Sequence, residues 1–220
     1  MAKVVIFGVR DFASLAHYYL RTDSEHDVVA FTTHRAFLPE VPTFEGLPVV
    51  PMDELSSRYP TDQFCAFAPM SHSKMNRVRE AVYQELKSIG YTLISYVSSR
   101  ATCLNEGAIG DNCFILENNT IQPFVSIGNN VVLWSGNHIG HHSCIKDHCF
   151  FTSHVVLSGH CVVEPYCFLG VNATIRDQLT LAEGSLIGMS AIITKETEAW
   201  SVYKADGSRA SKVSSKDLDF

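Results

Sequence analysis

Large apolar residues recur at every sixth position through the second part of the chain. All fifteen positions on this spacing from Ile109 to Ile193 carry a large apolar side chain. The position four further on is usually small or slender, as at Cys113, Val131 and Ala173. Such a hexapeptide repeat predicts a parallel β-helix, in which each six-residue rung forms one flat face and three rungs form one turn. We expect the large residue to fill the interior and the small residue to fit beside it.

The first hundred residues follow a different pattern, in which strand-like and helix-like segments alternate. Short apolar runs predict strands over residues 4–7, 28–32, 49–50, 64–68 and 93–97. Helices are expected over residues 11–20, 53–59 and 74–89. Asp11 is the expected N-cap of the first helix. Alternation of this kind predicts a small parallel sheet in a Rossmann-like arrangement.

The predicted fold class is therefore an α/β Rossmann-like N-terminal domain followed by an all-β parallel β-helix. Glycine usage changes at the same place, because only three of the 13 glycines lie in the first hundred residues. We expect the Rossmann-like domain to span residues 1–98 and the β-helix residues 99–195. A C-terminal tail is expected over residues 196–220.

Composition limits the kinds of partner that the protein can bind and indicates its cellular compartment. The chain is 46% hydrophobic with a net charge of −6, and an acidic balance argues against a nucleic-acid partner. No apolar run approaches the roughly 18 residues that a membrane span needs, and the N-terminus turns polar too soon for a signal peptide. We therefore expect a cytoplasmic protein that has no membrane partner.

The seven cysteines contain no CxxC pair, which in a cytoplasmic protein indicates reduced thiols rather than disulfides or a zinc site. Four of them, Cys113, Cys149, Cys161 and Cys167, occupy the small interior position of the repeat. We interpret these four as core residues.

Six of the ten histidines fall between residues 138 and 160. Four of the six sit three residues after the interior position, which directs them outward or to a corner: His142, His148, His154 and His160. Residues 18 apart should stack at the spacing of neighbouring strands, so His142 is expected over His160. His141 and His142 follow Gly140, where the lack of a side chain leaves room for a ligand. A histidine there is suited to take a proton from an attacking amine or hydroxyl.

Four segments carry a resemblance to a known family: the opening VVIFG, LWSGNHIGHHSCIKDHCFF (residues 133–151), LSGHCVVEPYCFLGVNATIRD (157–177) and LIGMSAIIT (186–194). The chain resembles, over nearly its whole length, the NeuD-like sialic acid O-acetyltransferase family. This family includes bacterial N-acetyltransferases of nucleotide-linked 4-amino sugars. The resemblance implies a left-handed β-helix and a homotrimer that binds acetyl-CoA between the β-helices of neighbouring subunits. It also implies that the N-terminal domain holds the nucleotide of a nucleotide-sugar substrate.

The resemblance places the family's catalytic histidine at His141. The neighbouring position, commonly a carboxylate that orients this histidine, is His142 here. The nearest acidic residues within the repeat are Asp147 and Glu164. A further family position, a histidine that lines the acyl pocket, is Phe150 in this chain and implies a more apolar pocket.

Binding residues are expected in both domains. For the pantetheine arm of acetyl-CoA, the resemblance indicates Ser158, Gly159, Gly170 and Gly188. For the CoA phosphates, which need cations, the candidates are Lys195, Lys204, Arg209 and Lys212, although interspersed acidic residues are equally typical of a solvated tail. For the nucleotide sugar, the candidates are Gly8, Arg10, Asp11, Thr33, Ser71 and His72.

The leading hypothesis is an acetyl-CoA-dependent N-acetyltransferase of a nucleotide-linked 4-amino sugar, with direct transfer and no metal. O-acetylation of a sugar is the nearest alternative, because the same base serves either nucleophile. A zinc enzyme of the γ-carbonic anhydrase type is a more remote alternative that uses His138, His141, His142 and His160. A non-catalytic trimeric binding module is the last.

Overall fold

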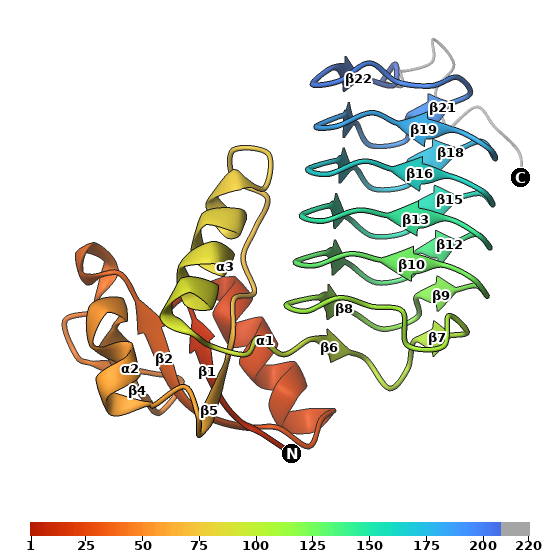
Figure 1. Cartoon of the computed structure of the whole chain (residues 1–220). Coiled ribbons are helices and arrows are strands. Elements are labelled where there is room, and N and C mark those ends of the chain that lie inside the picture. Colours follow the sequence, from red (N-terminus) through yellow and green to blue (C-terminus); the bar gives the residue numbers. More distant parts are fainter. Residues whose placement is uncertain (208–220) are drawn as a thin grey trace, which may run out of the picture.

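The computed structural model describes residues 1–207 as two packed units (Figure 1). An N-terminal α/β domain lies beside the first turns of a columnar β-helix. The predicted fold class, a Rossmann-like domain followed by a left-handed parallel β-helix, is confirmed. Within residues 1–207, no helix combines the length and the apolar character that crossing a membrane requires.

The N-terminal domain is built on a five-stranded sheet in the order β3-β4-β2-β1-β5. Its strands are β1 (Lys3–Phe7), β2 (Asp27–Thr33), β3 (Thr43–Phe44), β4 (Leu47–Pro51) and β5 (Phe64–Phe67). All neighbours pair in parallel except β3 and β4. The helices are α1 (Asp11–Thr22), α2 (Leu55–Arg58) and α3 (Arg77–Ile89), with 3-10 turns η1 (Arg35–Phe37) and η2 (Met52–Glu54).

Three local expectations for this domain are wrong in detail. Arg10, not Asp11, is the N-cap of α1. Asp11 lies in the first turn, where its negative charge interacts favourably with the positive end of the helix dipole. The helix expected from residue 74 begins at Arg77, because Lys74, Met75 and Asn76 have positive φ angles that a right-handed helix excludes. The strand expected over residues 93–97 is divided: Leu93 bridges to Ala66, whereas Tyr96 and Val97 join the β-helix.

The β-helix consists of three parallel sheets. The seven-stranded sheet contains β6 (Tyr96–Val97), β8 (Phe114–Ile115), β11 (Val132–Leu133), β14 (Phe150–Phe151), β17 (Phe168–Leu169), β20 (Leu186–Ile187) and β22 (Val202–Tyr203). The six-stranded sheet contains β7 (Thr102–Cys103), β9 (Thr120–Ile121), β12 (His138–Ile139), β15 (Val156–Leu157), β18 (Thr174–Ile175) and β21 (Ile192–Ile193). The four-stranded sheet contains β10 (Ser126–Ile127), β13 (Cys144–Ile145), β16 (Val162–Val163) and β19 (Thr180–Leu181). Strands of the β-helix therefore lie on both sides of the 99–195 span that the sequence indicates.

Strand pairs join residues 18 apart, as in the pair Val132 and Phe150, so three rungs complete one turn as predicted; the last pair, Leu186 and Val202, is 16 apart. The apolar residues of the six-residue spacing are buried from Ile115 to Ile193, and Ile109, which precedes them, is partly buried. The four interior cysteines are fully buried, as expected. The position three residues after the interior one has a positive φ angle at most corners, including those of His142 and His160. Histidine and asparagine adopt this conformation more readily than most residues, which accounts for their abundance there.

The seven-stranded sheet packs against the N-terminal domain through a shared apolar core. Phe114, Val132 and Phe150 point outward from this sheet, yet all three are buried. The ring of Phe12 on α1 lies with its centroid 5.7 Å from that of Trp134 and 6.3 Å from that of Phe150. His148, predicted at an outward corner, is also buried because α3 covers it, and burial lowers its pKa. The two units are therefore joined by a continuous core.

Arg79 on α3 is fully buried at this interface. Its guanidinium group donates hydrogen bonds to the carbonyl oxygens of Asn130, His148 (3.0 Å) and Cys149 (3.2 Å) and to Oδ1 of Asn76 (3.0 Å). Desolvation lowers the pKa of Arg79 to about 10, which leaves the group charged at neutral pH. This single side chain thus satisfies backbone carbonyls on two adjacent turns of the β-helix.

We expect Arg79→Ala to lower the free energy of unfolding by about 3 kcal/mol or more, because each buried carbonyl left unpaired costs about 1–3 kcal/mol. Chemical denaturation followed by circular dichroism measures the change. Arg58→Ala is the matched control, because Arg58 pairs with Glu54 on the exposed surface, where ion pairs add little stability. Equal stability of the Arg79 and Arg58 variants would contradict the role given to Arg79.

Candidate active site

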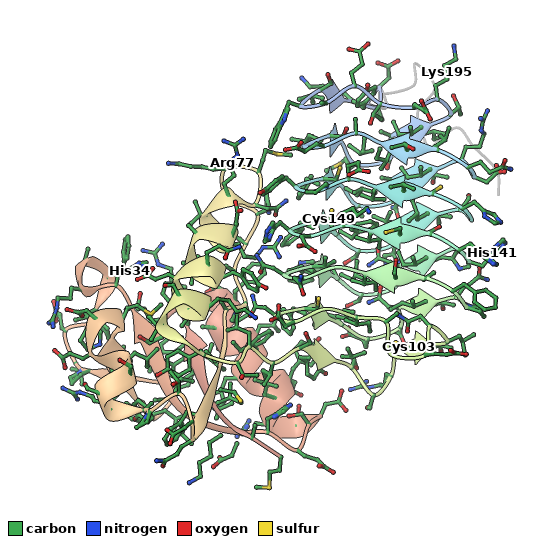
Figure 2. All side chains as sticks on the ribbon, viewed as in Figure 1. His34, Arg77, Cys103, His141, Cys149 and Lys195 are labelled. Carbon is green, nitrogen blue, oxygen red and sulfur yellow. The ribbon has the colours of Figure 1, made fainter. Side chains whose placement is uncertain are left out.

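Three histidines meet at one exposed corner of the β-helix, between β12 of the six-stranded sheet and β13 of the four-stranded sheet. They are His141, His142 and His160, and all three side chains are exposed. Figure 2 places His141 at the edge of the β-helix that faces away from the N-terminal domain. The three residues are called the histidine corner below.

The strand register stacks the rings of this corner. The rings of His142 and His160 have centroids 4.8 Å apart and planes only 13° apart, as the 18-residue spacing predicts. The ring of Phe124, one turn earlier, lies with its centroid 4.6 Å from that of His142. The ring of His141 is perpendicular to both histidine rings of this column. The column therefore provides a fixed wall beside His141.

His141 is held by a hydrogen bond to its backbone and by close packing of its ring on Gly159. The backbone N–H of His141 donates to Oε1 of Gln122 at 2.8 Å. A Cβ atom on Gly159 would lie 2.9 Å from Cε1 and 3.0 Å from Nε2 of the His141 ring. A Cβ atom on Gly140 would lie 2.5 Å from the backbone nitrogen of Gly159, so the wall is thin at both residues. Gly159 thus leaves the space that the imidazole occupies, and Gly140 allows the two successive turns to approach closely.

The Nδ1 atoms of His141 and His142 are 3.0 Å apart, which is a hydrogen-bond distance. In a neutral pair, one of these nitrogens donates and the other accepts. When Nδ1 of His141 donates, Nε2 of His141 keeps its lone pair and can act as a base. His142 thus lies where its Nδ1 can fix the orientation and the tautomer of the His141 ring.

Asp147 and Glu164, the nearest acidic residues within the repeat, lie at a different corner from His141. Asp147 follows β13 and accepts a hydrogen bond from the backbone N–H of Asn129 at 2.7 Å, at the next corner of the β-helix. Glu164 follows β16 of the same four-stranded sheet and lies toward that same corner. The side chain within hydrogen-bond distance of the His141 ring is thus a second imidazole.

The residues predicted to bind the nucleotide sugar gather at the carboxyl edge of the N-terminal sheet. Gly8, Arg10 and Asp11 follow β1, Thr33 ends β2, and Ser71 and His72 follow β5. Ligands of open α/β sheets bind at this edge, where the chain leaves neighbouring strands in opposite directions. Gly8 has a φ angle of +114°, which few other residues tolerate. Thr33 is buried, whereas Arg10 and His72 are exposed.

His72 connects this edge to the β-helix. Its ring centroid lies 5.1 Å from that of Phe150 and 4.5 Å from that of Phe168. Although part of the residue is exposed, partial desolvation of the ring and the positive charge of Arg79 lower the pKa of His72. Phe150 is only 2% exposed. Within one chain, Phe150 is therefore covered by the N-terminal domain and does not line an open acyl pocket, contrary to the expectation.

The predicted cofactor residues divide into two pairs. Ser158 and Gly159 adjoin Gly140 and His141. Gly170 and Gly188 follow β17 and β20 and stack on each other at a different corner, where a Cβ atom on Gly170 would lie 2.5 Å from the backbone nitrogen of Met189. Lys195 lies at the end of the column (Figure 2), and Lys204 follows β22. Arg209 and Lys212 lie outside the described residues.

One chain does not bring the two groups of candidate residues together. The histidine corner faces away from the N-terminal domain, whereas His34, beside Thr33, marks the opposite side of the molecule in Figure 2. His138 lies on the outer face of the six-stranded sheet and is not part of the histidine corner. Sequence reasoning missed Gln122 and Phe124, although counting back 18 residues from Gly140 and His142 locates both.

Comparison with known proteins agrees with this architecture. Residues 108–141 match the family described as bacterial transferase hexapeptide (six repeats). The acetyltransferase domain of PglB from Neisseria gonorrhoeae is similar in structure, with a TM-score of 0.76 and 18% identity over 92% of this chain and 96% of that chain. A histidine-to-asparagine mutant of perosamine N-acetyltransferase from Caulobacter crescentus, in complex with CoA and GDP-perosamine, has a TM-score of 0.80 and 19% identity over 94% of this chain and 98% of that one.

WeeI from Acinetobacter baumannii is similar as well, with a TM-score of 0.76 and 20% identity over 92% of this chain and 96% of its own. At these identities the likeness concerns the fold. The chain therefore contains the bacterial transferase hexapeptide repeat and has the two-domain fold of these solved structures.

Proposed function

We propose that this protein is an acetyl-CoA-dependent acetyltransferase that N-acetylates an amino group of a nucleotide-linked sugar. The observation that carries the proposal is the exposed pair of His141 and His142, joined at 3.0 Å through their Nδ1 atoms beside a wall thinned by glycine. Proteins of the same fold support it: one was solved with acetyl-CoA and another with CoA and GDP-perosamine. The position of the amine on the ring, which we expect to be C4, and the sugar are part of this proposal.

In the proposed reaction, Nε2 of His141 accepts a proton from the sugar amine as the amine nitrogen attacks the thioester carbonyl carbon. The carbon–sulfur bond then breaks, and CoA leaves as a thiol with a proton returned to sulfur. The hydrogen bond to His142 fixes the His141 ring and its tautomer through both steps. Transfer is direct, so no acyl-enzyme forms and no metal is needed.

Binding of the acceptor is assigned to the N-terminal domain. The N-terminus of α1 offers free N–H groups to a diphosphate, Arg10 supplies a positive charge, and Gly8 allows close approach of the ligand to the backbone. Ser71 and His72 flank the same sheet edge after β5. Because this edge and the histidine corner lie on different sides of one chain, we propose that a neighbouring copy in a homotrimer completes the site.

The pantetheine arm of acetyl-CoA is assigned to the glycine-rich wall. Ser158 and Gly159 border His141, and Gly170 and Gly188 form a second narrow stretch of exposed backbone. In a homotrimer, the two stretches would belong to the walls of one groove between subunits. Lys195 and Lys204 supply positive charge near the end of the column.

The function is tested by CoA release from acetyl-CoA in the presence of nucleotide-linked amino sugars and their hydroxy counterparts. Mass spectrometry of the products follows each reaction. We expect release that depends on one amino sugar and a product heavier by one acetyl group. Acetylation of only the hydroxy counterparts would favour O-acetylation. Absence of CoA release with every acceptor, from a protein that is folded and trimeric, would contradict the proposal.

We expect His141→Ala to lower turnover by about 10²–10⁴-fold, the usual contribution of a general base. The trimer and CoA binding should be unchanged, because the side chain is exposed. His154→Asn is the control, since His154 is an exposed corner histidine outside the histidine corner. Turnover of His141→Ala within about threefold of wild type would remove His141 from the catalytic role.

His142→Ala should cause a smaller loss, about 10–100-fold, as is typical when the partner that orients a functional histidine is removed. His142→Glu should recover much of the activity, because a carboxylate can accept the same hydrogen bond from Nδ1 of His141. Steady-state kinetics on the three proteins measure both effects. A glutamate variant as slow as the alanine variant would argue against an orienting role for His142.

A further inference from the structure

We propose that the histidine corner binds a divalent transition-metal cation, with Zn²⁺ as the probe, and that this ion blocks the base His141. The binding part stands on geometry alone, whereas the inhibitory part rests on the proposed function. Each of His141, His142 and His160 offers one ring nitrogen, and these three nitrogens lie within 4.8 Å of one another. All three belong to one chain, unlike a zinc site shared between subunits.

The strand register preorganises this cluster. His142 and His160 occupy equivalent corner positions of two successive turns, with φ angles of 59° and 57°. Their backbones are therefore held in register, and the ring of Phe124, one turn earlier, packs on the ring of His142. His141 sits over Gly159, which places no side chain in its way. Rotation of these exposed side chains about their own torsions brings the three nitrogens to the roughly 2.0–2.1 Å that zinc–imidazole bonds require.

The chemistry of the ligand set selects the kind of ion. Neutral imidazole suits zinc, copper and nickel, whereas calcium and magnesium prefer oxygen ligands. Three protein ligands leave the fourth tetrahedral position to water, as in open zinc sites. The histidine corner contains no carboxylate, so the two positive charges of the ion stay uncompensated by the ligands. Binding should therefore be reversible and removable by a chelator.

Metal binding and base catalysis compete for the same electron pair. A neutral imidazole has one nitrogen lone pair, and its other nitrogen carries hydrogen. Whichever nitrogen of His141 binds the ion, the remaining nitrogen keeps its hydrogen and accepts no proton from an amine. His160 is a ligand in this proposal, whereas in the proposed acetyl transfer it only packs beside His141 and accepts no proton. Substitution of His160 therefore removes a metal ligand while it leaves His141 and His142 in place.

Calorimetric titration of metal-free, untagged protein with Zn²⁺ tests the binding part. We expect one ion per chain for wild type and for His154→Asn. His160→Asn should bind at least about tenfold more weakly, because it loses a ligand while asparagine still tolerates the positive φ angle of the corner. The exposed Cys103 is the same in all three proteins and cancels in the comparison. Equal zinc affinity in the His160 and His154 variants would overturn the site.

Product formation measured by mass spectrometry tests the inhibitory part, because this readout avoids zinc binding to the released thiol. Zn²⁺ should stop transfer by wild type and by His154→Asn, and a chelator should restore it. Relative to its own rate without zinc, His160→Asn should require at least about tenfold more Zn²⁺ than wild type for the same fractional inhibition. Full activity of wild type with zinc bound would overturn inhibition. If no acceptor is ever acetylated, the proposed function fails, while the titration still decides the metal site.

Discussion

The hydrogen-bonded register of the β-helix determines the position of every residue in the histidine corner. From β6 to β21 each strand pairs with residues 18 positions away, so a side chain lies directly over its counterpart on the next turn. Because a large residue fills the interior at every rung, usually with a small one beside it, the turns cannot slip past each other without exposing apolar surface. The stack of Phe124, His142 and His160 is a direct result of this constraint. His141 then needs only the space above Gly159 to complete the arrangement.

A second constraint fixes the N-terminal sheet against this column. The apolar core shared by α1 and the seven-stranded sheet and the buried guanidinium of Arg79 hold the two units as one body. The carboxyl edge of the sheet is thereby fixed away from the histidine corner of its own chain. For the proposed reaction, this arrangement makes the contact between subunits part of the site. Assembly is then as important to catalysis as the residues themselves.

Much of this arrangement can be predicted from the sequence because the repeat is strict. The interior positions, the buried cysteines and the stacking of His142 on His160 all follow from counting in steps of six and 18. Counting does not show which face another domain covers, so the burial of His148 and Phe150 required the structure. Nor do local patterns reveal three successive residues with positive φ, which delay the start of α3 until Arg77. The pairing of His141 with His142 depends on rotamers, which no periodicity encodes.

The positive φ angles at the corners have an evolutionary consequence. Corner side chains that the N-terminal domain does not cover point into solvent, so exchanging one of them alters the outside of the column while the volume of the core stays constant. Asparagine, histidine, glutamine and serine already occur at exposed corners in this chain, at Asn172, His142, Gln178 and Ser190. A new surface chemistry can therefore arise by substitution at one corner and leave foldability untouched. In this architecture, surface chemistry and folding stability depend on different residues of the same six-residue unit.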